Sequence, residues 1–422
     1  MDINLSYGKK GLTVQLPTDL TTIVSPEFIP ALPDQQGAIK HVLRNPIKKP
    51  PLKTSVKPGQ KVAISICDVT RPMPNHTVLP IVLSELNHIP EEDITILIAT
   101  GTHRAVTKSE LTSMLGDSIL SKKYKIINHD AFDENTLTLV GNTVNGIDVY
   151  LNDRWVNSDF RITLGFVEPH FFAGFSGGPK MIAPGLAGFN TIMPLHSSEL
   201  IQHPESKWGV TYGNPIHDTI REISTMAPAD FSVDVTINKN HDITSVYAGN
   251  MSEVHHAACQ FTKDTAMQKV PHKYDIVITT NSGYPLDMNL YQSVKGMSAA
   301  YQIVRPGGII ICASECSDGI PDTGKYKEIL QSANTPSKLL EIISHPQHNK
   351  HDQWQVQIQA QIQETATIYL KTDYLSKADV QASHLKPVSN ITSFINKIVE
   401  ESITPPTICV LPEGPQTIPY VK

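Results

Sequence analysis

Cysteine is scarce in this sequence, and its arrangement excludes the usual cysteine-based stabilising elements. Five cysteines occur among 422 residues, and no two of them form a Cys-x-x-Cys pair. A zinc ribbon is therefore excluded, and an odd number of cysteines gives no reason to assign disulfides. Cys67 and Cys312 lie within apolar, strand-like segments, where buried free thiols are the common case. We expect neither disulfides nor a metal held by cysteine.

Long apolar runs and concentrated positive charge are also missing. No stretch approaches the roughly 18 uninterrupted apolar residues of a membrane span, and the segment Met1–Leu5 lacks the features of a signal peptide. The 35 basic residues are outnumbered by 41 acidic ones, for a net charge of −6, which disfavours nucleic acid as a partner. We expect a cytoplasmic protein that binds neither membranes nor nucleic acid.

The length and the pattern of the chain predict two α/β domains. A chain of 422 residues is too long for one core of ordinary size. Strand-like and helix-like segments alternate from about residue 60 onward, which is typical of mainly parallel sheets with crossover helices. A boundary falls near residue 271. We predict one domain over residues 1–270, completed by residues 391–422, and a second over residues 271–390.

Three apolar strands of the first domain are each followed by ionisable or polar side chains that could take part in binding or catalysis. The strand at 61–67 is followed by Asp68-Val69-Thr70-Arg71, the strand at 93–100 by Gly101-Thr-His103-Arg104, and the strand at 161–167 by His170. Open α/β sheets bind their ligands at the carboxyl ends of the strands. The sequence therefore predicts a site at this edge. Asp68 and Thr70 are equally suited to capping the turn before Pro72.

The segment from His170 to Lys180 reads His-Phe-Phe-Ala-Gly-Phe-Ser-Gly-Gly-Pro-Lys, and His196 follows it. Its glycines allow positive φ and let the backbone pass close to a bound group. Lysine can meet a phosphate or attack an electrophile, and imidazoles can move protons or hold a metal. The phosphate-loop signature fails because Pro179 precedes the lysine and Met181 follows it. By itself, the segment is equally a glycine-rich turn with a solvated lysine.

A predicted helix at 289–304 carries Tyr291, Gln292 and Lys295 near its start. Tyr291 and Lys295 are four residues apart and share a face. The partial positive charge of the helix N-terminus adds to that of Lys295, which favours an anion. An ordinary amphipathic helix with a solvated lysine fits the local pattern as well.

The ordered set of motifs resembles the nickel-pincer-dependent lactate racemase family. The motifs are Asp68-x-x-Arg71-Pro, Gly101-Thr-His103-Arg104, the His170–Lys180 segment, His196, Gly283–Asp287, Tyr291-Gln292-x-x-Lys295 and Asp352-Gln-Trp354. The match runs in order over nearly the whole chain. It implies two α/β domains with mainly parallel sheets and the active site in the cleft between them.

The resemblance also implies a cofactor and a role for each matching residue. The cofactor is a nickel ion in pyridinium-3,5-bisthiocarboxylic acid mononucleotide, the nickel-pincer nucleotide, which cofactor-biosynthesis proteins supply. It would be linked covalently to Lys180, and His196 would complete the nickel site. His103 and His170 would be the paired acid/base residues. The remaining positions would contact the cofactor (Asp68, Val69, Thr70, Arg71) or the substrate (Arg71, Tyr291, Gln292, Lys295, Trp354). Pro179 stands where some relatives carry a basic residue, so a phosphate contact from that position is not expected.

Those roles are chemically consistent with racemisation of a small 2-hydroxy acid. The carbon-bound hydrogen beside a carboxylate is a very weak acid, but it leaves as hydride when an electron-poor ring accepts it and a base takes the hydroxyl proton. The flat 2-keto acid can then be reduced on either face. Each enantiomer places its hydroxyl differently, so two bases are wanted, and an imidazole pKa of about 6.5 suits both directions. Lactate is the first candidate.

Two other classes of function fit parts of the sequence. A nucleotide-binding or phosphoryl-transfer protein would use the glycine-rich turn before Lys180 around phosphates. A non-catalytic binding protein on the same fold is the third possibility. His76, His203 and His217 match no motif element and are taken as surface or structural residues.

Overall fold

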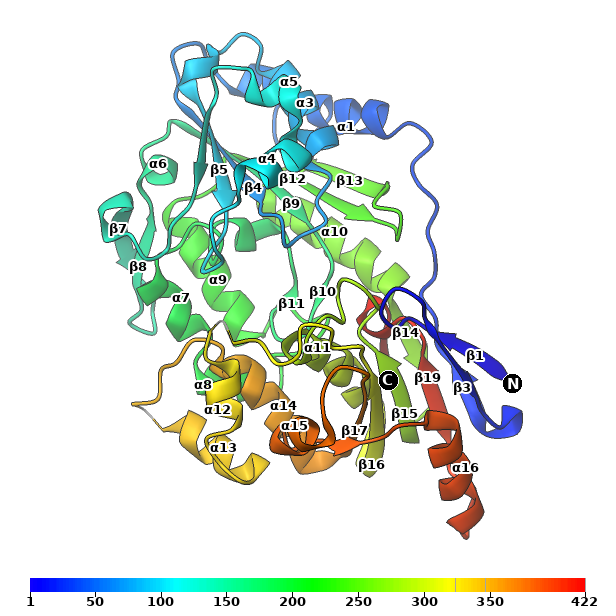
Figure 1. Cartoon of the computed structure of the whole chain (residues 1–422). Helices are drawn as coiled ribbons and strands as arrows, with labels where there is room; N and C mark the ends of the chain where they lie inside the picture. The colour runs from blue at the N-terminus through cyan, green and yellow to red at the C-terminus, as the bar shows by residue number, and fades with distance from the viewer. Residues whose placement is uncertain (323, 346, 422) are drawn as a thin grey trace. The chain divides into compact units, whose positions relative to one another are not determined.

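The computed structural model describes residues 1–322, 324–345 and 347–421, which form two compact units (Figure 1). Unit 1 comprises Met1–Glu27, Ser197–Gln202 and Thr265–Lys422; unit 2 comprises Phe28–His196 and His203–Asp264. Each unit is built around a six-stranded sheet that is mainly or entirely parallel. The structure is the two-domain α/β protein that the alternating sequence pattern predicts.

The sheet of unit 2 has the order β13-β12-β9-β4-β5-β6, and only its β12–β13 pair is antiparallel. Its strands are β4 (Val62–Cys67), β5 (Ile94–Ala99), β6 (Lys125–Asn128), β9 (Phe160–Phe166), β12 (Phe231–Ile237) and β13 (Ile243–Gly249). Every residue of β4 is buried, as expected of a central parallel strand covered on both faces. The chain adds strands on one side of β4 and then on the other. The carboxyl ends of β4 and β9 therefore flank a topological switch point, where such sheets bind ligands.

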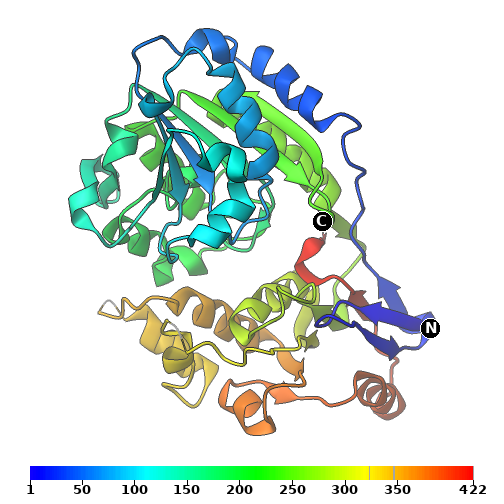
Figure 2. The same ribbon diagram turned by 45° about the horizontal axis from the view of Figure 1, so that its top comes forward.

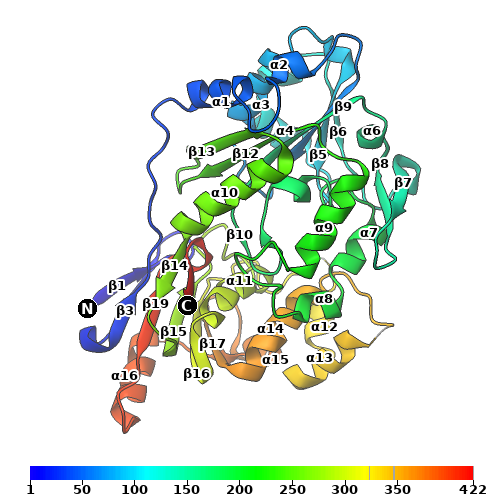
Figure 3. The ribbon, with the colours of Figure 1, turned by 180° about the vertical axis from the view of Figure 1, so that it is seen from behind.

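Helices cover both faces of this sheet. Helices α1 (Gln35–Arg44), α3 (Asn75–Glu85) and α4 (Lys108–Leu115) bury apolar side chains in one core with the central strands. Helices α9 (Pro215–Met226) and α10 (Met251–Ala266) lie on the other face (Figure 3). The periodicity of α9 explains its placement, because Ile216, Ile220 and Ile223 are buried on one side of the helix.

The sheet of unit 1 has the order β18-β17-β16-β15-β19-β3, and all of its pairs are parallel. Its strands are β3 (Thr21–Ile23), β15 (Tyr274–Thr280), β16 (Val304–Ala313), β17 (Thr367–Lys371), β18 (Lys386–Pro387) and β19 (Ile408–Leu411). Its principal helices are α11 (Leu290–Tyr301), α13 (Pro336–Ser344), α14 (Gln353–Thr365) and α16 (Ile391–Glu401).

The ends of the chain lie elsewhere than expected. Residues 1–27 and 391–422 belong to unit 1, not to the unit that contains β4. The reason is strand pairing: β19 lies between β15 and β3, so one strand from each terminal segment belongs to the six-stranded sheet of unit 1 (Figure 2). Strands β1 (Asp2–Leu5) and β2 (Leu12–Gln15) pack their apolar residues in the same core as α16. The observed change of unit at Thr265 lies close to the expected boundary near 271.

The remaining elements are short. They are α2 (Leu52–Ser55), α5 (Asp117–Leu120), α6 (Asp153–Val156), α7 (Phe189–Leu195), α8 (Ser198–Gln202), α12 (Tyr326–Leu330), α15 (Lys377–Ala382), β7 (Leu137–Asn142), β8 (Asp148–Asn152), β10 (Pro169–His170), β11 (Gly174–Phe175), β14 (Met267–Val270) and β20 (Ile418–Val421). Among the described residues, none of the helices has the length and apolar character needed to span a bilayer. All five cysteines are buried free thiols.

Candidate active site

The turn after β4 presents a buried carboxylate. Asp68 is 3% exposed, and its two oxygens have different partners. Oδ1 accepts a hydrogen bond from the Thr70 hydroxyl at 2.7 Å, and Oδ2 lies 2.8 Å from His103 Nδ1. Asp68 therefore does more than cap its own turn. It also binds the imidazole of His103, which follows the next strand, β5.

His103 reaches Asp68 because β4 and β5 are parallel and in register, with Cys67 opposite Ala99. The residues that follow the two strands are consequently neighbours. Burial raises the pKa of Asp68, but hydrogen bonds from His103 and Thr70 and the nearby charges outweigh it, so this pKa lies below its usual value. The ionised carboxylate accepts the Nδ1–H of His103. Nε2 is then the nitrogen of this ring that can take up a proton, and the His103 side chain is 47% exposed.

His170 follows β9 and opens the small antiparallel pair of β10 and β11, where it lies opposite Gly174. The backbone N–H of Ala173 donates to His170 Nδ1 at 3.2 Å. This contact favours the neutral tautomer with the proton on Nε2, the opposite of His103. The ring packs edge-on against Phe172, with centroids 4.5 Å apart. A hydrogen bond and an aromatic contact thus orient the imidazole.

His196 follows α7 as its C-terminal cap, and the Phe172 ring contacts both His196 and His170. The Phe172 ring contacts His196 edge-on at a centroid distance of 5.5 Å. His196 Nδ1 lies 2.9 Å from the carbonyl oxygen of Ile192, to which its N–H donates. The lone pair is therefore on Nε2, the nitrogen that can ligate a metal. An imidazole whose second nitrogen donates to a backbone carbonyl is the usual arrangement of a metal-binding histidine.

Lys180 lies on a short 3-10 turn, Gly178–Met181, beside the end of β4. The hydroxyl of Ser65 on β4 donates to the Met181 carbonyl at 2.8 Å, and the Gly185 N–H donates to the Lys180 carbonyl at 3.1 Å. Both bonds fix the backbone on either side of the lysine. The Lys180 residue is half-buried. The turn therefore holds one amine at the switch-point edge of the sheet.

The glycines of this segment serve the packing of the protein. Gly174, Gly177 and Gly178 have φ of 79°, 74° and 51°, so the expectation of positive φ is confirmed. A side chain at Gly174 would place Cβ 2.0 Å from the Val210 carbonyl oxygen, and one at Gly178 would meet the His255 ring at 2.4 Å. These glycines allow close contact with protein atoms beneath the loop. The expectation that they leave room for a bound group is not supported at these two positions.

The predicted substrate-binding residues Tyr291, Gln292, Lys295 and Trp354 lie in unit 1, whereas Val69 and Arg71 lie beside Asp68 in unit 2. Tyr291, Gln292 and Lys295 occupy the first half of α11, whose N-terminus is capped by the Asn289 side chain. Trp354 on α14 is buried and donates its indole N–H to the Tyr291 hydroxyl at 3.2 Å. Tyr291, Gln292 and Lys295 are each half-buried. The structure thus brings Tyr291 and Trp354 together. Both belong to unit 1, whereas the residues around β4 belong to unit 2.

Three groups missed by the sequence analysis lie under the loop that carries Lys180. Asp234 on β12, His217 on α9 and His255 on α10 are all buried. His217 is therefore structural, not a surface residue. The one signal available was Asp234 itself, a carboxylate inside the apolar alternating strand 231–237. Nothing in the sequence pairs it with the two histidines.

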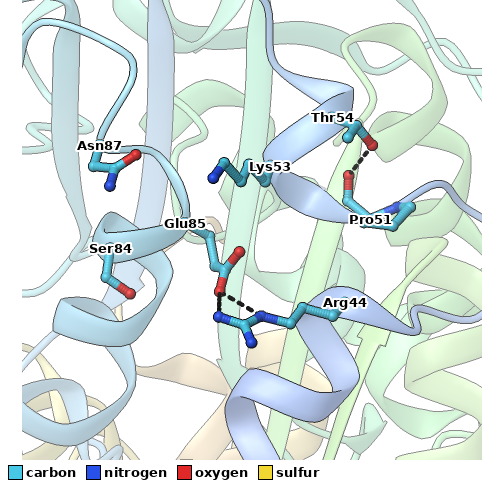
Figure 4. A pocket seen from close by; sticks show the side chains of 7 residues that line it. All are labelled: Arg44, Pro51, Lys53, Thr54, Ser84, Glu85 and Asn87. Atoms are coloured by element: carbon cyan, nitrogen blue, oxygen red, sulfur yellow. Dashed lines mark hydrogen bonds and ion pairs between the residues drawn. The ribbon is translucent and has the colours of Figure 1, made fainter.

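A hollow of about 400 Å³ occurs on unit 2 away from these residues (Figure 4). It lies among α1, α2 and the end of α3, and it includes Lys53, Ser84 and Asn87. The Arg44 guanidinium at its edge is paired with Glu85 at 2.9 Å. None of the predicted site residues lines this hollow, so it has no part in the site.

Known proteins resemble this chain over nearly its whole length. Residues 7–209 match the lactate racemase N-terminal domain, and residues 269–418 match the lactate racemase C-terminal domain. The chain is 32% identical to the lactate racemase of Thermoanaerobacterium thermosaccharolyticum, with 99% of each protein covered. It is also 32% identical to the lactate racemase of Lactiplantibacillus plantarum, with 98% of each covered.

Two solved structures are also similar to this protein. The lactate racemase apoprotein from T. thermosaccharolyticum matches with a TM-score of 0.92 and 32% identity, covering 99% of this chain and 100% of that one. A protein from Thermotoga maritima, 19% identical, shares the fold with a TM-score of 0.69 over 92% of this chain and 99% of its own. Fold and sequence together define a two-domain α/β isomerase. The chain belongs to the lactate racemase family, which confirms the resemblance of its motifs.

Proposed function

We propose that this protein interconverts the enantiomers of a short 2-hydroxy acid, with lactate as the first candidate. The observation that carries the proposal is the complementary setting of two imidazoles. Asp68 Oδ2 lies 2.8 Å from His103 Nδ1, whereas the Ala173 N–H donates to His170 Nδ1 at 3.2 Å. In these neutral tautomers, His103 accepts a proton at Nε2 and His170 donates a hydrogen bond from Nε2. The reverse reaction uses the opposite proton states of the pair.

The cofactor of this proposal is the nickel-pincer nucleotide, attached to Lys180. The residues present fit it: His196 has its Nδ1–H bonded to the Ile192 carbonyl, so Nε2 is the ligating atom, and imidazole with soft sulfur ligands suits nickel. When bound, the group supplies an electron-poor ring that takes a hydride from the substrate carbon and returns it. Asp68, Val69, Thr70 and Arg71 contact the cofactor in this proposal. Cofactor-biosynthesis proteins are the partners that maturation requires.

In this proposal, substrate recognition depends on two cationic side chains and on a pair of hydrogen-bonded aromatic side chains. Arg71 and Lys295 bind the substrate carboxylate, because cationic donors bind such a group with charge-assisted hydrogen bonds. Tyr291, Gln292 and Trp354 contact the rest of the small molecule. The Trp354 N–H bond to the Tyr291 hydroxyl, at 3.2 Å, supports a fixed wall there. Aromatic rings held in this way limit the size of the acid.

The test is to produce the protein with nickel and the cofactor-biosynthesis proteins, and in parallel without them. We expect about one nickel per chain, an added mass on Lys180, and racemisation of one or more acids in a panel of pure L- and D-2-hydroxy acids followed by chiral chromatography. Lys180→Ala, produced in the same way, should lack both the mass and the activity. An active preparation with neither nickel nor the added mass would overturn the proposal.

The phosphate-binding alternative has lost structural support. The Gly178 N–H, a donor that a phosphate would need, already donates to Asp234 Oδ1 at 3.2 Å, and the Cβ sides of Gly174 and Gly178 face Val210 and His255. Titration with ATP and magnesium tests the alternative directly. We expect no saturable binding, whereas tight binding without any dependence on nickel would restore it. Retained lactate binding without racemisation would instead point to a non-catalytic binding protein.

A further inference from the structure

A set of buried polar side chains holds the backbone between His170 and Lys180. We call Asn214, His217, Asp234 and His255 the loop platform. All four are buried, with exposures of 0%, 0%, 0% and 6%. They come from three separate elements, since Asn214 caps α9, His217 lies on α9, Asp234 on β12 and His255 on α10. Each one bonds to the main chain of the same loop.

The four contacts follow the loop in order. The Asn214 amide donates to the Phe172 carbonyl at 2.8 Å, and His217 Nδ1 lies 2.9 Å from the Ala173 carbonyl. His255 Nε2 lies 2.9 Å from the Ser176 carbonyl, and the Gly178 N–H donates to Asp234 Oδ1 at 3.2 Å. Each imidazole nitrogen that faces a carbonyl is a donor. The loop is thus fixed at four points between the imidazole of His170 and the amine of Lys180.

The side chains beneath the loop pack closely against its backbone and against β9. A Cβ at Gly178 would contact the His255 ring at 2.4 Å, and a Cβ at Gly165 would lie 2.1 Å from Asp234 Oδ1. The rings of His217 and His255 stack with centroids 5.3 Å apart and planes 8° apart. The platform is therefore a closely packed layer in direct contact with Gly178 of the loop.

The protonation states suit this role at neutral pH. Burial, aided by the charges of Arg221 and Lys180 and opposed by the bond to Ser176, lowers the pKa of His255 to about 4. Burial and the neighbouring His255 lower the pKa of His217 well below its usual value. Each ring is consequently neutral with one N–H, and the carbonyl that it faces determines which nitrogen carries it. The donor pattern toward the loop persists over the physiological range.

The platform also retains polar atoms at an energetic cost. Asp234 Oδ2 and His217 Nε2 are buried without a hydrogen-bond partner in the described part of the protein. An unsatisfied buried polar group destabilises the folded protein, and apolar side chains of similar size would avoid this cost. These polar residues are not needed merely to fill the space under the loop. They are needed to hold the loop backbone in one conformation through hydrogen bonds.

We propose that the loop platform is a set of positioning residues that fixes Lys180 relative to His170, so that the attached cofactor and the proton-transferring imidazole meet the substrate in one geometry. This inference rests on the proposed function, in which both residues act on the same substrate. It assigns the platform no chemical step. A misplacement of about 1 Å at such a site costs on the order of 100-fold in rate.

The experiment compares matched pairs of variants. In His255→Gln the amide can reach the position of Nε2 and donate to the Ser176 carbonyl, whereas His255→Asn is equally polar but too short. Asp234→Asn keeps an oxygen for the Gly178 N–H, and Asp234→Ala removes it. The proteins are matured with nickel and the cofactor pathway. Three quantities are measured: hydrogen exchange of the amides of residues 172–180, the added mass on Lys180, and kcat and KM per loaded enzyme.

We expect His255→Gln and Asp234→Asn to stay within about threefold of the wild type in kcat. We expect His255→Asn and Asp234→Ala to lose roughly 10- to 100-fold in kcat with little change in KM, and to exchange the loop amides faster. Equal kcat and equal exchange within each pair would overturn the inference, because a merely structural role predicts equal activity per loaded enzyme. A wild type that acquires no added mass would instead overturn the proposed function. Amide exchange in the unloaded proteins still decides whether the platform holds the loop.

Discussion

His103 Nδ1 lies 2.8 Å from Asp68 Oδ2, and this contact joins a half-exposed ring to a carboxylate that is 3% exposed. The carboxylate belongs to the turn after β4 and the ring to the turn after β5. Their hydrogen bond sets the tautomer of His103 and orients its ring. A buried acid behind an imidazole is a common way to orient a proton-transfer group.

Replacing Asp68 should impair the reaction through His103. We expect Asp68→Ala to lower kcat roughly 10- to 100-fold, as the loss of an outer-shell partner usually does, because the ring loses its orientation and its counter-charge. Steady-state rates with both lactate enantiomers measure the effect. Asp68→Asn is the matched comparison, since it keeps an oxygen that can accept the His103 Nδ1–H and lacks only the negative charge, and it should lose less activity than Asp68→Ala. Wild-type kcat in Asp68→Ala would contradict this role.

Both imidazoles should be needed in both directions. Each turnover removes a hydroxyl proton with one ring and returns a proton with the other, so neither variant can favour one enantiomer. We expect His103→Ala and His170→Ala each to lose about 10²- to 10⁴-fold in activity. Chiral chromatography from pure L and pure D substrate measures this. A variant that keeps full activity would remove that residue from the proposal.

His196 should affect nickel and leave attachment intact. We expect His196→Ala to carry the added mass on Lys180 but to retain much less than one nickel per chain, because the imidazole Nε2 no longer ligates the metal. Native and denaturing mass spectrometry with metal analysis separate the two outcomes. His203→Ala, at an exposed histidine, is the control and should keep its nickel. Full nickel retention in His196→Ala would exclude the residue as a ligand.

Trp354 and Tyr291, which are joined by a hydrogen bond, should act together in substrate binding. Trp354→Phe removes the indole donor and Tyr291→Phe removes the hydroxyl that receives it at 3.2 Å. We expect each to raise KM several-fold, in line with a hydrogen bond of about 1 kcal/mol, with kcat nearly unchanged. The double variant should be no worse than either single one. Additive effects on KM would show that the two residues act independently.

Asp234 should make stability depend on pH in a defined direction. Burial raises the pKa of Asp234 to about 7, against the opposing Gly178 hydrogen bond. Between the unfolded pKa of about 4 and the folded value, the folded state therefore binds more protons than the unfolded one. The contribution of Asp234 to stability is full below about pH 4 and falls as the pH rises toward 7.

Asp234→Asn lacks this ionisation, so its free energy of unfolding relative to the wild type should increase with pH across that window. We expect an increase of roughly 2–4 kcal/mol between pH 4 and 7. Urea denaturation of both proteins at several pH values measures it, and the titration of His255 cancels because both proteins contain it. A difference that stays constant with pH would contradict the raised pKa.

Local patterns predicted where several of the candidate site residues lie in the fold. Uninterrupted apolar runs marked β4, β5 and β9, and the polar residues just after them, Asp68, His103 and His170, lie at the switch-point edge of one sheet. Parallel strands end at the same edge, so this result needs only strand periodicity. The order of the motifs identified the family. Strand periodicity and the motifs can both be recognised from residues that are close together in the sequence.

Long-range pairing was not accessible in the same way. The terminal strands β3 (Thr-Thr-Ile) and β19 (Ile-Cys-Val-Leu) are short segments that do not indicate their partners, and only their pairing places them in the sheet with β15. The glycines of the loop predicted positive φ, but not that Val210 and His255 would occupy the space beside them. These facts depend on which elements pack together, and many arrangements satisfy the same periodicity.

By itself, the sequence determined the α/β class, the ends of the strands and the identity of the side chains there, because alternation, apolar runs and turn residues act within a few positions. The tertiary structure alone decided that Asp68 bonds His103 and that Asp234, His217 and His255 hold the Lys180 loop. Those contacts join residues that are 35 to 79 positions apart. Their distances are set by strand register and helix packing, which arise only when the whole chain has buried its core.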